Sequence, residues 1–148
     1  MPDPRHRPLP QSRALLLAVV ALTSGIAASA GAQAGRTVHD GVYTEAQAAR
    51  GAMVYGKECA FCHGDDLLGG GFAAPLVGEP FETRWKSESA GDLFIIVKAT
   101  MPADGPSRLS DQQYADVLAY LLQMNKWPAG KAELGTAVAE LKTIKFRR

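Results

Sequence analysis

The chain has 148 residues, with 16 basic and 15 acidic side chains and a formal net charge of +1. This balance lacks the basic excess of a nucleic-acid-binding protein, and the length suits one domain with a modest core. The sequence shows no internal repeat, and it contains two cysteines.

The first 34 residues have the pattern of a secretory signal peptide. Three arginines form a positive n-region, an apolar run begins at Ala14, and small residues follow it. Possible A-x-A cleavage sites end at Ala30, Ala32 or Ala34. The pattern therefore predicts export to the periplasm, followed by removal of the leader.

An uncleaved membrane anchor is the alternative interpretation of the same segment. Residues 14–35 carry no charge, and the stretch is just long enough to cross a bilayer. The residues become small and weakly apolar after Leu22, which favours cleavage. Cleavage removes three arginines and one aspartate, and it leaves 13 basic and 14 acidic side chains with a net charge of −1.

Three segments have the periodicity and the capping residues of helices, and they are expected over residues 45–58, 90–99 and 111–123. Thr44 is a plausible N-cap of the first segment, and Ser89 and Ser110 begin capping boxes for the other two. Loops rich in Gly and Pro are expected at 64–80 and 102–109. Because no strand pattern is visible, the sequence predicts an all-α fold.

Residues 59–63 read Cys-Ala-Phe-Cys-His, which is the attachment sequence C-x-x-C-H of a c-type haem. Cys59 and Cys62 lie three residues apart, so a helical turn points both thiols to one side. That spacing suits two thioether bonds to one edge of a porphyrin. His63 follows directly and can reach the iron. The motif predicts one covalently bound haem c, with His63 as an iron ligand.

Zinc and redox-thiol sites are the competing interpretations of this motif. A structural zinc site needs four ligands, usually from paired C-x-x-C units, and here the fourth would have to be His39. A thioredoxin-type pair needs a surrounding βαβ pattern, which is not visible. A plain disulfide between Cys59 and Cys62 gives no reason for the adjacent His63. Haem attachment is therefore the favoured interpretation.

Met101 is the predicted sixth ligand of the iron. It follows the second helical segment and precedes Pro102, which biases it toward an extended conformation. The thioether can then leave the helix and turn toward the ring. Met53 and Met124 are the rivals, but Met53 lies in the first helical segment and Met124 closes the third, where both are more typical of packing.

The last segment, residues 131–148, ends in several basic residues. Two interpretations stay open for it. It docks a partner, or it is a solvated and mobile terminus, and the second interpretation is favoured.

Over residues 44–130 the chain resembles the class I c-type cytochromes. In that family an N-terminal helix with the pattern G-x-x-x-aromatic crosses a C-terminal helix, and here the pattern is Gly51 and Tyr55. The segment 117–121, Val-Leu-Ala-Tyr-Leu, resembles the C-terminal partner. The resemblance implies a cytochrome c-like fold with three main helices and loops around one haem. It also implies that Gly51 lets the two helix backbones approach where Ala119 and Tyr120 cross.

The resemblance also implies roles for four residues. The carbonyl of Pro75 would accept the Nδ1 proton of His63, which orients the ring toward the iron. Met101 lies in an M-P-x loop of the kind that carries the family's methionine ligand. Arg84 or Trp85 would donate a hydrogen bond to a haem propionate.

These matches divide the chain into a leader at 1–34, a cytochrome c domain at 35–130 and a C-terminal extension at 131–148. Trp85 and the segments 101–102, 116–120 and 125–130 further resemble the haem domains that serve periplasmic quinoprotein alcohol dehydrogenases. The resemblance implies a dehydrogenase as the electron donor, and an oxidase or another cytochrome as the acceptor.

Ligation by His63 and Met101 leaves the iron no open position, which favours an electron carrier over an enzyme. The expected partners are redox proteins, with no nucleic acid, and with a membrane only if the leader stays attached. A fixed subunit of a dehydrogenase complex is one alternative. A haem enzyme or sensor with a displaceable sixth ligand is the other, and it is disfavoured because His39 is the only spare histidine after the leader.

Overall fold

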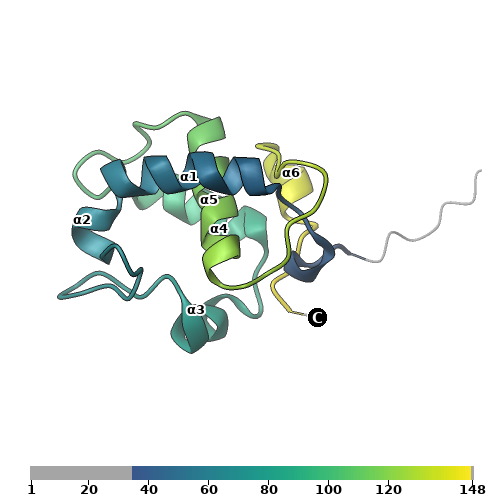
Figure 1. Cartoon of the computed structure of the whole chain (residues 1–148), viewed down its shortest axis with the longest axis horizontal. Helices are drawn as coiled ribbons and strands as arrows, with labels where there is room; N and C mark the ends of the chain where they lie inside the picture. The colour runs from purple at the N-terminus through teal and green to yellow at the C-terminus, as the bar shows by residue number, and fades with distance from the viewer. Residues whose placement is uncertain (1–34, 148) are drawn as a thin grey trace, which may run out of the picture. The chain divides into compact units, whose positions relative to one another are not determined.

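The computed structural model describes residues 35–147, and the predicted leader lies outside these residues. The described part contains six α-helices, one short 3₁₀ helix and no strand (Figure 1). The predicted all-α fold is therefore confirmed. None of the helices in residues 35–147 has the length and apolar character to cross a membrane.

The helices follow the chain in the order η1 (Val38–Asp40), α1 (Glu45–Glu58), α2 (Ala60–His63), α3 (Gly78–Trp85), α4 (Ala90–Thr100), α5 (Asp111–Met124) and α6 (Val138–Leu141). The three longest, α1, α4 and α5, are the three that the sequence predicts. Each begins where its capping residue predicts, because the side chains of Thr44, Ser89 and Ser110 each accept a backbone hydrogen bond from the first turn.

Helix α3 was not expected, because its beginning lies in a stretch predicted as a loop. The residue before it, Val77, makes no side-chain capping hydrogen bond, and Pro80 lies in its first turn. Proline is tolerated there because the first N–H groups of a helix have no partner within the helix. The sequence therefore carries no start signal at this point, and packing of Phe81 and Trp85 into the core decides the helix.

Helix α1 crosses α5, as Figure 1 shows. A Cβ atom on Gly51 would lie 1.9 Å from the carbonyl oxygen of Asp116 and 2.9 Å from the Cβ of Tyr120. The rings of Tyr55 and Tyr120 pack beside this contact with their centroids 5.3 Å apart. The predicted close approach is present, but the backbone that Gly51 meets is that of Asp116, one turn before Ala119.

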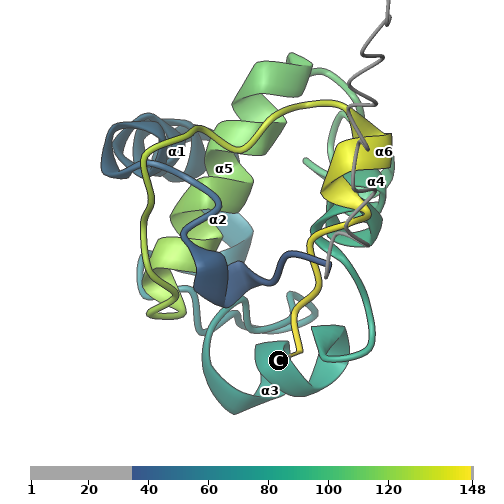
Figure 2. The same ribbon diagram turned by 90° about the vertical axis from the view of Figure 1, so that its right-hand side faces the viewer.

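Residues 131–147, which we call the C-terminal strap, return to the core of the cytochrome domain (Figure 2). Its buried apolar side chains are Leu134, Leu141, Ile144 and Phe146. Ile144 accepts a hydrogen bond from the N–H of Ala90, and Lys145 accepts one from Val38, both at 2.9 Å. The prediction of a solvated, mobile terminus was therefore wrong.

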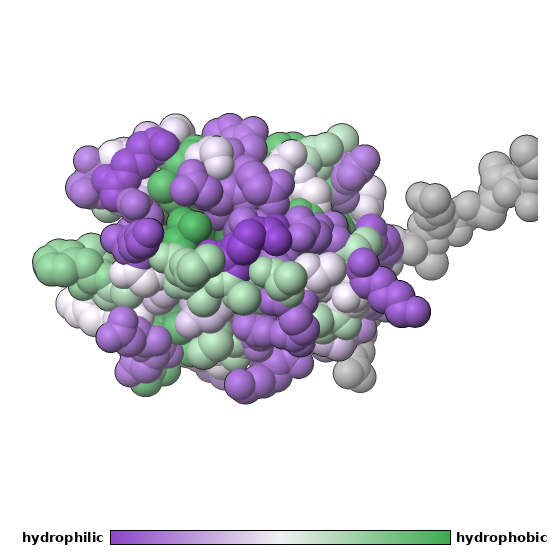
Figure 3. All heavy atoms as spheres, turned by 45° about the horizontal axis from the view of Figure 1, so that its top comes forward, coloured by the Kyte–Doolittle hydropathy of each residue, from purple (hydrophilic) through white to green (hydrophobic). Residues whose placement is uncertain are grey.

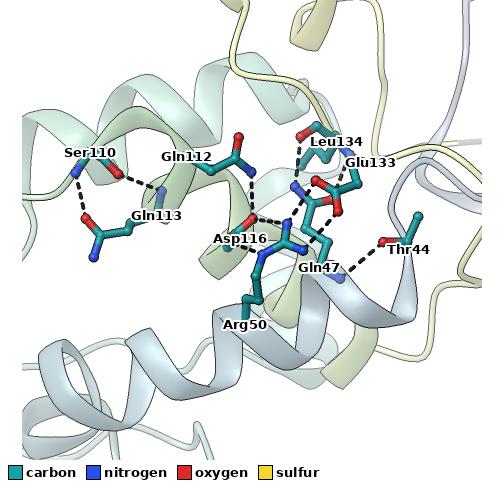
Figure 4. A network of polar contacts seen from close by, with 9 residues as sticks. All are labelled: Thr44, Gln47, Arg50, Ser110, Gln112, Gln113, Asp116, Glu133 and Leu134. Atoms are coloured by element: carbon teal, nitrogen blue, oxygen red, sulfur yellow. Dashed lines mark hydrogen bonds and ion pairs between the residues drawn. The ribbon is translucent and has the colours of Figure 1, made fainter.

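Two side chains of α1 hold the start of the strap (Figure 4). The buried amide of Gln47 donates to the carbonyl of Leu134 at 2.8 Å and accepts from its N–H at 2.7 Å. Arg50 pairs with the buried carboxylate of Asp116 at 3.0 Å and with Glu133 at 2.9 Å. The strap is thus tied directly to α1, and Arg50 links it to Asp116 on α5.

Candidate haem site

The C-x-x-C-H motif forms one helical turn at the end of α1. Cys59 is the C-cap of α1, and α2 begins at the next residue, Ala60. The carbonyl of Cys59 accepts hydrogen bonds from the N–H groups of Cys62 at 3.2 Å and His63 at 3.0 Å. Both cysteines are free thiols. The structure therefore brings the three motif residues together in the single turn that their spacing predicts.

The imidazole of His63 is buried, with 8% of its surface exposed, and its Nδ1 lies 2.9 Å from the carbonyl oxygen of Ala74. A carbonyl only accepts, so Nδ1 of the neutral ring carries the proton and Nε2 keeps the lone pair. Such a bond fixes the orientation and the tautomer of a metal-binding histidine. The ring is thus prepared to donate Nε2 to an iron atom.

The prediction that the Pro75 carbonyl accepts this bond was wrong by one residue, because the acceptor is the carbonyl of Ala74. The loop after the motif is closed by a hydrogen bond from the N–H of Ala73 to the carbonyl of Gly70, at 2.9 Å. The carbonyl that follows this closure, that of Ala74, faces the imidazole. Pro75 contributes the ring that stiffens the Ala74–Pro75 peptide, and its own role at a haem stays a prediction.

The rest of the loop is held by single hydrogen bonds to backbone atoms. The hydroxyl of Tyr55 donates to the carbonyl of Gly64 at 2.7 Å, and the N–H of Gly69 donates to His63 at 2.9 Å. Burial raises the pKa of Tyr55, so its hydroxyl stays protonated and remains a donor. These bonds hold the chain close to the motif without regular secondary structure.

Met101 lies directly after α4 with φ −125° and ψ 152°, the extended conformation that the following proline favours. Its N–H donates to the carbonyl of Val97 at 2.8 Å, and its own carbonyl accepts from the hydroxyl of Tyr114 at 2.8 Å. The backbone of Met101 is therefore anchored on both sides. Whether its sulfur binds iron stays a prediction.

The two rival methionines lie in other surroundings. Met53 is 64% exposed on α1, and Met124 is partly buried against an apolar cluster that includes Tyr55, Leu67 and Leu121. Both lie within helices, Met53 in α1 and Met124 in α5, whereas Met101 lies just after a helix with its carbonyl held by Tyr114.

Arg84 and Trp85 lie at the end of α3. Trp85 is buried in an aromatic cluster with Phe81, Trp127 and Phe146, at ring distances of 5.5 to 6.4 Å. The guanidinium of Arg84 lies over the Trp85 ring, 4.6 Å from its centroid. Packing and a cation–π contact account for this pair, and hydrogen bonding to a propionate stays a prediction.

The competing metal and redox interpretations gain no support. His39, the fourth ligand that a zinc site would need, packs edge-on against Trp127. Over residues 35–147 no three His, Cys, Asp or Glu side chains are grouped to hold a metal ion. Burial, with a smaller contribution from Glu58, raises the pKa of Cys59 to about 11, whereas a reactive thiol needs a lowered pKa.

Residues 46–121 match the family model described as "Cytochrome C oxidase, cbb3-type, subunit III". The chain belongs to this family. The searches of curated proteins and of solved structures gave no significant match. The match covers the motif, most of both crossing helices and the Met101 loop, and so the all-α architecture is a cytochrome c fold.

Membership gives the chain haem-based electron transfer with a covalently bound haem c. The donor set fits that group, because two free thiols on one turn are followed by a histidine whose Nε2 is available. When bound, the haem supplies one-electron chemistry at its iron. The cytochrome works with redox partners, as an electron carrier or as a subunit of an oxidase.

Apolar side chains reach the surface around the motif. Phe61 and Phe72 are fully exposed and Leu68 is 61% exposed. Figure 3 shows hydrophobic atoms protruding at the left end of the molecule, where Figure 1 places α2 and the loop after it. The polypeptide next to the motif is thus apolar, whereas much of the rest of this face is polar.

Sequence reasoning missed three residues that shape this site: Ala74, Tyr114 and Asn125. Ala74 carries no chemical signal, because it acts through its backbone carbonyl. Tyr114 was indistinguishable from a packing residue in an amphipathic helix. Asn125 follows α5, and its side chain forms hydrogen bonds with the backbone of Leu76 and Gly78 in the loop after the motif. A polar residue is typical of a helix end, so nothing local indicates this distant contact.

Proposed function

We propose that this protein is a periplasmic electron carrier with one haem c, in which His63 and Met101 are the axial ligands. It takes single electrons from a dehydrogenase and passes them to an oxidase or another cytochrome. The leader 1–34 would direct export, and thioether bonds would form at Cys59 and Cys62. With both axial positions filled, the protein would bind and orient the haem and exclude substrates from the iron.

The observation that carries this proposal is the geometry of the motif turn. The Ala74 carbonyl lies 2.9 Å from His63 Nδ1, which leaves Nε2 as the one free lone pair of a buried ring. The extended backbone at Met101 supports the second ligand, since it turns the residue out of α4. A thioether ligand favours ferrous iron and raises the reduction potential, as an electron carrier between a dehydrogenase and an oxidase requires.

The test is the optical spectrum of the purified holoprotein, oxidised and reduced, with and without carbon monoxide. We expect the wild type to show the sulfur-to-iron charge-transfer band and not to bind carbon monoxide. Met101→Ala should lose the band and bind the gas. Met53→Ala, on the exposed side of α1, is the matched control and should behave as the wild type. A wild type that binds carbon monoxide readily would instead favour a sensor or enzyme.

A fixed subunit of a larger complex is the second candidate, because the matched family is named after an oxidase subunit. Trp85 and the segments 101–102, 116–120 and 125–130 also resemble the haem domains of quinoprotein alcohol dehydrogenases, which supports a dehydrogenase as the partner. Copurification from periplasm separates the candidates. A carrier should elute alone at its own mass, whereas a subunit should elute with a stoichiometric dehydrogenase or oxidase.

A further inference from the structure

Asn125 is a buried polar residue at the end of α5, with 8% of its surface exposed. Its Nδ2 donates to the carbonyls of Leu76 and Leu121, each at 2.9 Å. Its Oδ1 accepts from the N–H of Gly78 at 3.0 Å. Both donor hydrogens and one acceptor site of the amide are therefore used, and two of the three partners lie 47 and 49 residues earlier in the chain.

Those two partners follow the residue that holds His63. The chain runs from Ala74, whose carbonyl binds His63 Nδ1, through Pro75 to Leu76. Pro75 has a fixed φ, so this stretch has little freedom to rotate. A second bond, from the N–H of Leu76 to the carbonyl of Leu67 at 2.8 Å, holds Leu76 from the other side. Fixing Leu76 and Gly78 on α5 therefore restricts where the Ala74 carbonyl lies.

We propose that Asn125 is a positioning residue for the axial histidine. It clamps the segment 74–78 to the end of α5 and so holds the Ala74 carbonyl against His63 Nδ1. The inference rests on the proposed function, in which His63 binds iron. A hydrogen bond at Nδ1 raises the basicity of a histidine ligand, and a more basic ligand favours ferric iron. Loosening the clamp should weaken that bond and raise the reduction potential.

A purely structural cap would have a different signature. Asn125 also bonds the carbonyl of Leu121 within its own helix, so its removal lowers stability in either case. The test must therefore use readouts that stability alone does not move. Two are suitable: the reduction potential, and the rate at which the Nδ1 proton of His63 exchanges with solvent.

The experiment compares Asn125→Ala with Gln47→Ala in the purified holoprotein. Gln47 is a matched control, because it is also a buried amide with hydrogen bonds to backbone, but it holds the strap at Leu134. The potential comes from optical redox titration, and the exchange rate from ¹⁵N NMR of the ferrous protein. We expect Asn125→Ala to raise the potential and to speed Nδ1 proton exchange about tenfold, the effect of weakening one hydrogen bond.

Gln47→Ala should lower the free energy of unfolding by a similar amount and change neither readout. The proposal is overturned if Asn125→Ala leaves both readouts at their wild-type values, or if the two variants shift them equally. If Asn125→Ala gives too little holoprotein, the uncharged pair Asn125→Leu and Gln47→Leu replaces it. Asn125→Leu keeps a side chain of similar volume, adds no charge and loses the hydrogen bonds to Leu76, Gly78 and Leu121, so the same two outcomes decide.

The wild type separates this inference from the proposed function. Haem-shifted NMR signals from the His63 ring establish that His63 is a ligand. Without those signals, the proposed function fails before any variant is compared. With them, only the comparison of Asn125 and Gln47 variants decides whether Asn125 positions the ligand.

Discussion

At the crossing of α1 and α5, two regular helices pack backbone against backbone, whereas the loop after the motif is held by hydrogen bonds from side chains of α1 and of the end of α5. The crossing depends on Gly51, which admits the backbone of Asp116. The loop depends on Tyr55 at Gly64 and on Asn125 at Leu76 and Gly78. The comparison indicates that the packed helices form a rigid frame. A few side-chain hydrogen bonds fix the loop backbone near His63 to that frame.

The strap should contribute most to stability, because it adds buried apolar surface to the core. Phe146→Ala removes a buried ring that packs on Trp85 and Trp127, and we expect a loss of about 4 kcal/mol in the free energy of unfolding. Urea unfolding of the purified protein measures it. Phe72→Ala, the same change at a fully exposed ring, should cost less than about 0.5 kcal/mol. Equal effects of the two substitutions would mean that the strap is not part of the core.

The crossing itself should respond almost as strongly to one methyl group. Gly51→Ala places a Cβ where the Asp116 carbonyl lies, so the helices must separate, and we expect a loss of about 3 kcal/mol. Gly56 lies in the same helix, and a Cβ there meets nothing within 4 Å. Gly56→Ala should therefore stabilise the protein by about 0.5–1 kcal/mol through helix propensity. Both values come from urea unfolding, and a stabilising Gly51→Ala would contradict the crossing.

At the site, the expected effect is smaller in stability but specific in chemistry. Tyr114→Phe removes the hydrogen bond to the Met101 carbonyl, and we expect about 1 kcal/mol of lost stability together with partial carbon monoxide binding. Tyr43→Phe is the matched control, because that hydroxyl donates to the Trp127 carbonyl at 2.7 Å. It should cost a similar amount of stability and leave carbon monoxide binding at the wild-type level. Carbon monoxide binding by both variants would show that loss of stability, rather than the Met101 anchor, exposes the iron.

The smallest effect concerns the start of α4. Hydrogen bonds from Ser89 lower the pKa of Asp92 below its usual value of 3.8. A lowered pKa in the folded state means that the ionised carboxylate stabilises the fold above the unfolded pKa. This contribution is lost as the pH falls through the folded pKa. We expect Asp92→Asn to cost less than about 1 kcal/mol at neutral pH, because the side chain is partly exposed, and the difference from wild type should shrink below pH 3.8. Urea unfolding as a function of pH measures it, and a difference that grows in acid would be the wrong sign.

Local sequence was sufficient for the features that depend on neighbours in the chain. The bounds of α1 and α5 follow from apolar periodicity and from the caps Thr44 and Ser110, whose partners lie three residues away. The motif turn follows from the spacing of Cys59, Cys62 and His63, since a helical turn places them together. The extended backbone of Met101 follows from the next residue, a proline.

Tertiary structure alone decided the features that depend on residues far apart. The partner of His63 is a backbone carbonyl, which every residue possesses, so no residue type marks Ala74. Asn125 and Leu76 meet only because α5 packs beside the loop. The strap is buried because Phe146 packs into the apolar core, which forms only when the chain folds. From the sequence alone, the basic end of the strap is typical of a solvated terminus. Only the folded structure shows the apolar surface that buries its Leu134, Leu141, Ile144 and Phe146. The sequence thus determined which chemistry the chain carries, and long-range packing decided which residues hold that chemistry in place.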